Sequence, residues 1–215
     1  MPLLLDQSLP NNTRLLVWDI SEETDWLKSR VILDKEEEDL YLTFTHDPRR
    51  KQWLSVRLLL QHYFAGKANQ YVYYDEFHKP YLKDSTFHIS ISHSHQLAGI
   101  IISESIEPGL DIEKLAHGIE KIKNRFLSDE ELHMIKEPHQ KEQLHIYWCA
   151  KEVMYKIYGR KKLEFKENLK IVPYTDETEG RLKGQLLKGG EEMNFDIYYR
   201  QLGGYMIAWG YEING

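Results

Sequence analysis

The sequence lacks the features that mark disulfide-rich, membrane-spanning or nucleic-acid-binding proteins. It holds a single cysteine, Cys149, so no disulfide can form within the chain. No apolar run approaches the roughly 20 residues that a membrane-spanning helix needs, and residues 1–5 are too short for a secretory signal. The formal net charge is −6, so no overall positive field favours nucleic acid. We therefore expect a cytoplasmic protein without membrane or nucleic-acid partners.

The chain does have enough apolar residues to form a core. Hydrophobic residues make up 41% of the 215 positions and charged residues 29%, which suits one globular domain or two small halves. Cys149 lies beside Trp148 and Ala150 in a segment with helical periodicity, so we expect it to be a small buried side chain without a catalytic role.

Hydrophobic periodicity predicts a first half that mixes strands and helices. Two helices are expected on either side of a turn at Asp47-Pro48, because apolar residues recur there with helical spacing. Shorter alternating or apolar runs predict strands around them. The predicted helices cover 36–44 and 48–64, and the predicted strands cover 15–20, 87–92 and 97–103.

The second half begins with a predicted strand at 109–113 and then changes to helical periodicity. Ser128 followed by three acidic residues is typical of a helix start, and a long helix over 142–158 is expected to stop at Gly159. Residues 163–211 then alternate between hydrophobic and polar side chains, with two glycine pairs as turns. This pattern predicts a three-stranded antiparallel meander.

A faint internal repeat relates the two halves. Five residues recur at a constant offset of 95 positions: Lys28, Arg30, Asp34, Glu36 and Trp53 return as Lys123, Arg125, Asp129, Glu131 and Trp148. Each set leads into a predicted helix that carries a charge, Arg57 in the first half and Glu152 in the second. We expect an α+β protein of two pseudo-symmetric halves, 1–105 and 106–215, each a small antiparallel sheet packed by helices, with a ligand site between them.

Two carboxylates alternate along the predicted strand at 109–113. Asp111 and Glu113 project from one face, while Leu110 and Ile112 enter the core. Such close carboxylates favour a neutralising cation, and Mg²⁺ prefers a few carboxylate oxygens completed by water and phosphate. The pair alone is equally compatible with a solvated strand end.

The long predicted helix adds a third carboxylate. Helical spacing places Trp148, Glu152 and Lys156 on one face. By itself a Glu–Lys pair with this spacing is typical of an exposed helix and contributes only about 0.2–0.5 kcal/mol. Together with Asp111 and Glu113, however, Glu152 completes a candidate metal site, and Lys156 supplies a cation for phosphate.

Residues 89–94 predict a strand that runs into a hydroxyl-rich turn. The N–H groups, hydroxyls and imidazole of Ser92, His93 and Ser94 are suited to phosphate oxygens. A zinc site at the local histidines is disfavoured, because no cysteine accompanies them and His88 and His93 face opposite ways on an extended segment.

In this order, the segments resemble the 4′-phosphopantetheinyl transferase superfamily, specifically its longer two-halved class typified by the surfactin-synthetase-activating enzyme. The most specific part is an Asp-x-Glu segment followed by Trp-x-x-Lys-Glu-x-x-x-Lys. The resemblance implies two similar α+β halves with the active site in the cleft between them. It rests on Arg49-Arg50 through Leu59, Lys79-Pro80, 91–94, 109–113, Arg125-Phe126 and 148–156.

The resemblance also implies the role of each matching residue. It gives Mg²⁺ ligands Asp111, Glu113 and Glu152; catalytic residues Glu152, Lys156 and Asp111; and coenzyme A contacts Arg50, Arg57, Lys79, Pro80, Ser92, His93, Asp111 and Lys156. Mn²⁺ accepts the same oxygen ligands, so the choice of metal stays open. Two departures affect the coenzyme A side: His78 stands where the family usually has glycine, and residues 34–39 are acidic where some relatives have lysines.

The implied reaction moves 4′-phosphopantetheine from coenzyme A to a serine of an apo acyl or peptidyl carrier protein and releases 3′,5′-ADP. The first half would bind the adenine and 3′-phosphate, and the second half would hold the metal. We expect a monomer, because the cleft forms within one chain. Two alternatives remain: a non-catalytic regulator that binds coenzyme A or a carrier, and a metal-dependent phosphoesterase acting on coenzyme A or a nucleotide.

Overall fold

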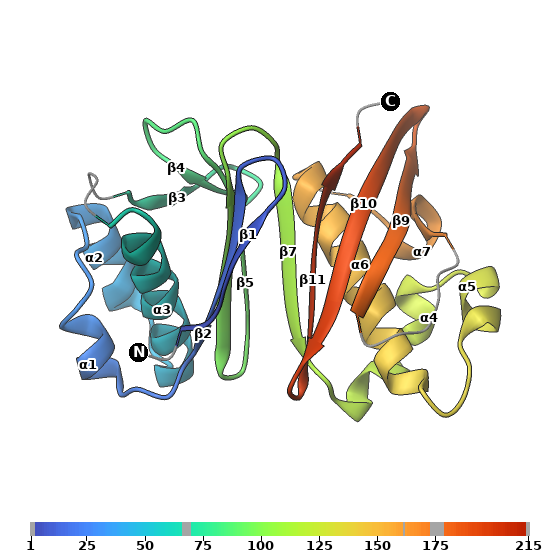
Figure 1. Ribbon diagram of the computed structural model, residues 1–215, viewed down its shortest axis with the longest axis horizontal. Helices are drawn as coiled ribbons and strands as arrows, with labels where there is room; N and C mark the ends of the chain where they lie inside the picture. The colour runs from blue at the N-terminus through green and yellow to red at the C-terminus, as the bar shows by residue number, and fades with distance from the viewer. Residues whose placement is uncertain (1–2, 66–69, 161, 173–178, 214–215) are drawn as a thin grey trace. The chain divides into compact units, whose positions relative to one another are not determined.

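The chain divides into two compact units, each built on an antiparallel sheet. A computed structural model describes residues 3–65, 70–160, 162–172 and 179–213. The units comprise Met1–Ile106 and Glu107–Gly215, and Figure 1 shows helices packed on a sheet in each of them. The predicted α+β class is confirmed. None of the helices in the described part of the chain is long and apolar enough to cross a membrane.

The first unit has a four-stranded sheet in the order β1-β2-β6-β5, with a separate β3–β4 hairpin. Its longest helix, α3, packs on the central strands β2 and β6. The strands are β1 Leu3–Leu9, β2 Thr13–Asp19, β3 Val72–Tyr74, β4 Pro80–Leu82, β5 His88–Ser94 and β6 Leu97–Ser103. The helices are α1 Thr24–Lys28, α2 Lys35–Thr43 and α3 Asp47–Tyr63.

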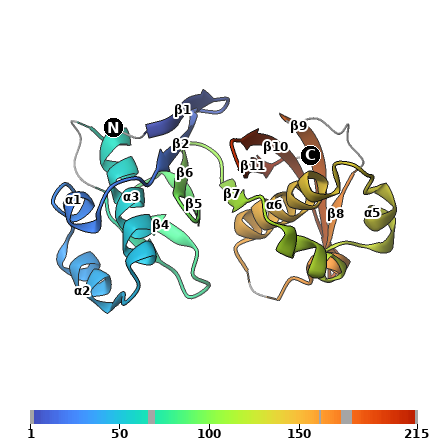
Figure 2. The ribbon, with the colours of Figure 1, turned by 90° about the horizontal axis from the view of Figure 1, so that it is seen from below.

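The second unit has a five-stranded sheet in the order β7-β11-β10-β9-β8. Helix α6 packs across this sheet, as Figure 2 shows from below. The strands are β7 Pro108–Lys114, β8 Leu169–Ile171, β9 Glu179–Lys188, β10 Glu191–Leu202 and β11 Tyr205–Glu212. The helices are η1 His117–Lys121, α4 Lys123–Phe126, α5 Asp129–Met134, α6 Gln140–Tyr158 and α7 Phe165–Asn168.

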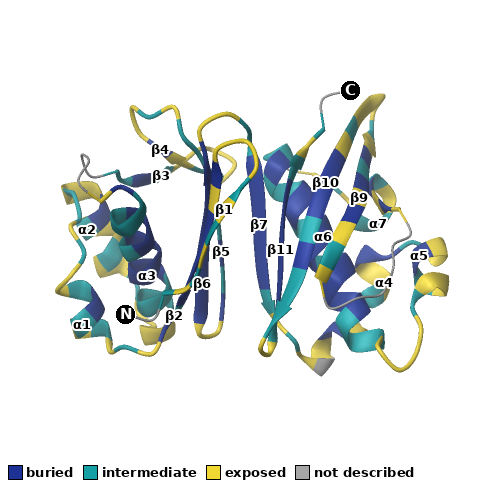
Figure 3. Ribbon diagram, viewed as in Figure 1, coloured by how far each residue is buried: buried dark blue, intermediate teal, exposed yellow. Residues whose placement is uncertain are grey.

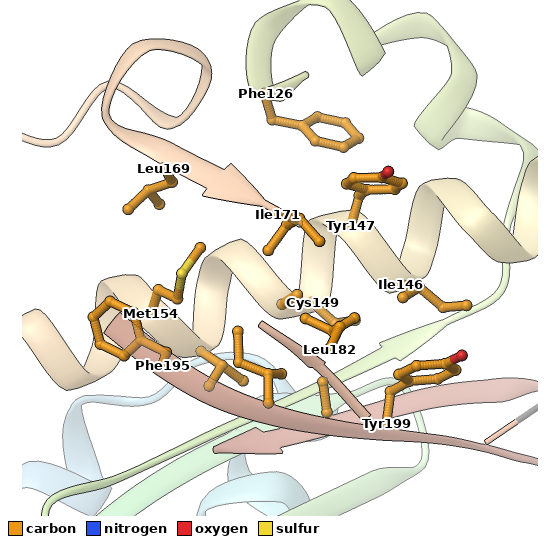
Figure 4. Close-up of a cluster of buried hydrophobic side chains, with 14 of the residues drawn as sticks. Phe126, Ile146, Tyr147, Cys149, Met154, Leu169, Ile171, Leu182, Phe195 and Tyr199 are labelled. Atoms are coloured by element: carbon orange, nitrogen blue, oxygen red, sulfur yellow. The ribbon is translucent and has the colours of Figure 1, made fainter. Parts of the chain in front are cut away.

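The core of the second unit lies between α6 and the sheet. Cys149 and Met154 on α6 are fully buried, and they meet strand residues such as Leu182 and Phe195 (Figure 4). In each unit the central strands are mostly buried, while exposed residues lie on the outer faces of the helices (Figure 3). The prediction that Cys149 is a buried thiol is therefore confirmed.

Helix ends follow the local sequence signals closely. Ser128 caps α5 through the N–H of Glu131, and the Glu131 side chain returns a bond to the N–H of Ser128, which forms a capping box. Helix α6 ends at Gly159 with φ +65°, as predicted. The predicted meander is confirmed as β9, β10 and β11.

Several features were not predicted from the sequence. Strands β1 and β8, the β3–β4 hairpin and the short helices α1, η1, α4 and α7 were missed. The predicted hydroxyl-rich turn is wrong in position, because Ser92, His93 and Ser94 belong to strand β5. Pairing with β6 continues through all three residues, so the chain reverses only at residues 95–96.

The repeat is real, but its helical register differs from the prediction by one residue. The order β2-β6-β5 in the first unit matches β7-β11-β10 in the second. The buried counterpart of Glu131 is Glu37, three residues after the N-cap Asp34, whereas Glu36 is exposed. The helices therefore correspond at an offset of 94, because a glutamate three residues after the cap turns inward in both units.

Strand β7 approaches α6 unusually closely at Gly109. A Cβ atom at this position would lie 2.6 Å from the carbonyl oxygen of Val153 and 2.9 Å from Cγ1 of Ile157. Any side chain larger than hydrogen would therefore separate the strand from the helix.

We predict that Gly109→Ala destabilises the protein by about 1–3 kcal/mol, because the added methyl group overpacks the contact between β7 and α6. Urea unfolding measures this change. Gly118→Ala is the matched control, since an added Cβ there meets no atom within 4 Å. Equal midpoints for the two variants would contradict the account.

His145 makes stability depend on pH. Its Nδ1 donates to the carbonyl of Lys141 at 2.7 Å, and its Nε2 accepts the N–H of Ala116 at 3.3 Å, an arrangement that requires a neutral ring. Burial lowers the pKa of His145 below its ordinary value. The unfolded chain therefore binds a proton that the folded state excludes as the pH falls below about 6.5.

We predict that the wild type loses more stability than His145→Gln between about pH 7.5 and about pH 5.5, because only the wild type carries this histidine. Urea unfolding at both pH values measures the difference. Identical pH dependences of the two proteins would show that His145 does not couple folding to protonation.

Candidate active site

Strand β7 and helix α6 bring the predicted catalytic side chains together. Asp111 and Glu113 on β7 lie directly opposite Ala208 and Met206 on the neighbouring strand β11, and these two residues belong to the core around α6. Because directly opposite residues share a face of the sheet, both carboxylates point to the side that α6 covers. Leu110 and Ile112 are buried, as predicted, but they occupy the face opposite α6 and do not belong to the hydrophobic cluster around that helix.

Lys156 neutralises Asp111. Its Nζ lies 2.8 Å from Oδ1 of Asp111 and donates a second bond, also 2.8 Å, to the carbonyl of Leu110. The Asp111 side chain is almost fully buried, while 27% of the Lys156 side chain is exposed. This lysine therefore holds the buried carboxylate and remains accessible to a ligand.

Glu152 lies one helical turn before Lys156 and interacts electrostatically with Lys156, Asp111 and Glu113. Burial, together with the charges of Asp111 and Glu113, raises the pKa of Glu152 to about 7, against the opposing effect of Lys156. The negative charges of Asp111 and Glu113 thus repel that of Glu152, and Lys156 is the positive charge that opposes this repulsion. Such crowding of like charges is typical of functional sites.

Trp148 connects the aromatic core to Glu113. Its indole Nε1 donates to Oε1 of Glu113 at 3.3 Å. The indole ring contacts Phe126 with centroids 5.2 Å apart and Phe165 with centroids 5.7 Å apart. Sequence reasoning placed Trp148 on the correct helical face but missed Phe165, because the short helix α7 that carries it was not predicted.

A pocket of about 680 Å³ opens beside Glu152 within the second unit. Its walls combine aromatic and aliphatic side chains with a charged rim. It is lined by Ile122, Arg125, Phe126, Trp148, Glu152, Tyr155, Leu163, Glu164, Phe165, Lys166 and Glu167. A pocket of this size next to a carboxylate is suited to a small organic group.

The first unit contains a second group of predicted site residues. Arg49 on α3 contacts Nε2 of His93 on β5, and the neighbouring Ser92 is buried. Gln52, one turn after Arg49, donates to the carbonyl of His95 at 3.0 Å. The resemblance implies a ligand role for Arg50 and not for Arg49, although Arg49 lies one turn before Trp53 on the same face of α3.

The remaining predicted ligands lie elsewhere in the first unit. Arg50 donates from Nε to the carbonyl of Phe44 at 2.8 Å. Lys79 and Pro80 are half-buried at the β3–β4 hairpin. Arg57 is 3% exposed and pairs with Glu37 at 3.1 Å. Its guanidinium therefore belongs to a core ion pair and does not present the accessible charge that the resemblance implies.

A divalent cation fits the chemistry of the β7–α6 cluster. Asp111, Glu113 and Glu152 offer hard oxygen ligands, and their mutual repulsion favours a positive ion. In the part of the chain that the structure describes, no three His, Cys, Asp or Glu side chains converge on a point that could hold a metal ion. The expected convergence is not found in this arrangement, in which Asp111 is bonded to Lys156 and Glu113 to Trp148.

Comparison with known proteins gives one finding that bears on this cluster. Residues 107–209 match the family model of the 4′-phosphopantetheinyl transferase superfamily. The match begins just before β7 and ends within β11, so it contains all four charged residues of the cluster. No curated protein matches the chain. This part of the chain is therefore similar to a superfamily of transferases.

We predict that Glu152→Gln stabilises the metal-free protein at about pH 8, because this substitution removes one of three repelling carboxylates at a pH above the pKa of Glu152. Urea unfolding in the presence of a chelator measures the gain. Glu167→Gln, at an exposed position on the pocket rim, provides the control. A loss of stability in Glu152→Gln, with Glu167→Gln unchanged, would argue against electrostatic crowding.

Proposed function

We propose that the protein transfers 4′-phosphopantetheine from coenzyme A to a serine of an apo acyl or peptidyl carrier protein in the presence of a divalent cation. In this proposal it is a monomer of the two-halved class of the superfamily. The observation that carries the proposal is the cluster of Asp111, Glu113, Glu152 and Lys156, which lies inside the matched region.

The reaction requires attack by the serine oxygen on the phosphorus next to pantetheine. A new P–O bond forms, the bond to the bridging oxygen of the pyrophosphate breaks, and 3′,5′-ADP leaves with the additional negative charge. The ammonium group of Lys156 is partly exposed and is therefore accessible to a phosphate oxygen. Its positive charge, in a partly buried site, would stabilise charge on the leaving group.

Glu152 is the proposed acceptor of the serine proton. Without a cation, burial and the neighbouring carboxylates raise the pKa of Glu152 to about 7. A bound cation would lower this pKa, which leaves Glu152 ionised and able to accept a proton near neutral pH. The adjoining pocket, with its aromatic walls, has the size to hold the slender pantetheine arm while the phosphate lies near Glu152.

Asp111, Glu113 and Glu152 are the proposed ligands of Mg²⁺ or Mn²⁺. When bound, the ion would neutralise charge on the diphosphate of coenzyme A. The three carboxylates would then hold the ion, and Lys156 would exchange its bond with Asp111 for one with phosphate.

The first unit is proposed to bind the nucleotide end of coenzyme A. His93 and the adjacent Arg49 offer imidazole and guanidinium groups for the 3′-phosphate. Ser92 precedes His93 on strand β5, so its buried side chain faces the opposite way and does not reach the same phosphate. Lys79 and Pro80 would line the adenine. Arg57 is left out of this set because Glu37 already binds it in the core.

Incubation with coenzyme A, Mg²⁺ and apo carrier proteins from fatty-acid, polyketide and nonribosomal-peptide systems tests the function. Mass spectrometry should show a carrier that gains one phosphopantetheine arm. Release of 3′,5′-ADP without a carrier would instead indicate a phosphoesterase. Binding of coenzyme A or a carrier with no transfer to any of them would indicate a regulator.

We predict that Glu152→Gln lowers the transfer rate by a factor of about 10²–10⁴, the usual contribution of a positioned general base. Labelling of the carrier protein over time measures the rate. Glu130→Gln should retain the wild-type rate, because Glu130 is exposed on α5 and does not line the pocket. Near-normal labelling by Glu152→Gln would exclude Glu152 from the chemistry.

We predict that Lys156→Ala raises the KM for coenzyme A by about tenfold or more, because a charge-assisted hydrogen bond to phosphate is lost. Steady-state kinetics with varied coenzyme A measure the change. Unchanged KM and kcat would remove Lys156 from the ligand site.

A further inference from the structure

Lys151 precedes Glu152 in the chain but lies on the inner side of α6. Its side chain is completely buried. Its Nζ donates to three oxygens: the carbonyl of Phe126 at 2.6 Å, Oε2 of Glu131 at 2.7 Å and the carbonyl of Phe165 at 3.2 Å. An ammonium group has three N–H donors, so these partners satisfy it fully.

Glu131 joins the same ammonium group to two further segments. Its Oε2 also accepts the N–H of Ser128 at 2.8 Å, and its Oε1 accepts the N–H of Ile171 at 3.0 Å. Through Glu131 and Lys151, helix α6 is therefore bonded to the end of α4, the starts of α5 and α7, and strand β8.

The two carbonyls that Lys151 binds belong to the two phenylalanines that flank Trp148. The rings of Phe126 and Phe165 contact the indole, and the indole N–H donates to Glu113. A continuous set of contacts thus leads from Lys151 through two backbone positions and three aromatic rings to a carboxylate of the β7–α6 cluster.

We propose that Lys151, held by Glu131, is a positioning residue that fixes Phe126 and Phe165 against Trp148, so that the indole orients Glu113 next to Glu152. Lys151 does not touch a ligand in this role. Its effect on catalysis rests on the proposed function, whereas its effect on Trp148 does not.

The first unit contains the same buried pair without the catalytic cluster. Glu37 and Arg57 are nearly inaccessible, and Glu37 accepts the N–H of Val72 at 3.1 Å, as Glu131 accepts that of Ile171. Strands β2 and β7 correspond at an offset of 95, because Leu16 and Trp18 face α3 as Asp111 and Glu113 face α6. With the helix offset of 94, Leu58 corresponds to Glu152. This pair therefore provides a matched control for the cost of losing a buried ion pair.

The test compares two double variants that remove both charges and leave no uncompensated buried ion. They are Glu131→Gln with Lys151→Met, and Glu37→Gln with Arg57→Met. The protein is labelled with 5-fluorotryptophan, and the Trp148 signal among the five tryptophans is assigned with Trp148→Phe. Fluorine NMR and transfer kinetics are then measured on folded protein, well below each unfolding temperature.

The Glu131/Lys151 variant should shift or broaden the Trp148 resonance and lower kcat about tenfold or more, with a smaller change in the KM for coenzyme A. The Glu37/Arg57 variant should leave the Trp148 resonance in place. A folded Glu131/Lys151 variant with an unchanged Trp148 resonance and unchanged kcat would overturn the proposal, as would an equal Trp148 shift in the control.

Phe165→Leu keeps the test decisive if the double variant does not fold. This substitution removes one of the two rings that pack on Trp148 and leaves the buried ion pair intact. The Trp148 resonance should therefore shift or broaden and kcat should fall, as in the double variant. An unchanged resonance and kcat in this variant would overturn the proposal. If the wild type transfers nothing, the proposed function fails, while the fluorine measurement still decides whether Lys151 positions Trp148.

Discussion

The candidate site depends on the close packing of strand β7 against helix α6. Gly109 allows the strand backbone to approach the carbonyl of Val153 where any Cβ would collide. This approach places Asp111 within hydrogen-bonding distance of Lys156 and within the electrostatic range of Glu152. A short strand and a long helix thereby concentrate three carboxylates and one lysine in a partly buried volume, where charge interactions are stronger than in water.

The same unit also holds a buried ion pair that makes no direct contact with this cluster. Breaking such a pair on one side costs about 3–5 kcal/mol, because the remaining charge stays buried without a partner. The glutamate accepts backbone N–H groups and the lysine binds backbone carbonyls, so each charge also satisfies the ends of helices α4, α5 and α7. The repeat of Glu37 with Arg57 in the first unit shows that this arrangement belongs to the fold itself.

Local signals predicted the elements that carry the cluster. The alternation of Asp111 and Glu113 with buried Leu110 and Ile112, the capping box at Ser128 and the stop at Gly159 all depend on residues that are neighbours in sequence. Elements without a strong periodic signal, such as β1, α4 and α7, were missed. The partner of Arg57 could not be inferred either, because Glu37 approaches it from another helix.

The sequence by itself determined which residues share a strand face or a helix face, since strand and helix periodicities are local properties of the backbone. Only the tertiary structure decided which of those residues meet. It assigned Lys156 to Asp111, Trp148 to Glu113 and Arg57 to the core. Those contacts depend on the distance between a strand and a helix, and that distance is set by how side chains fill the space between them.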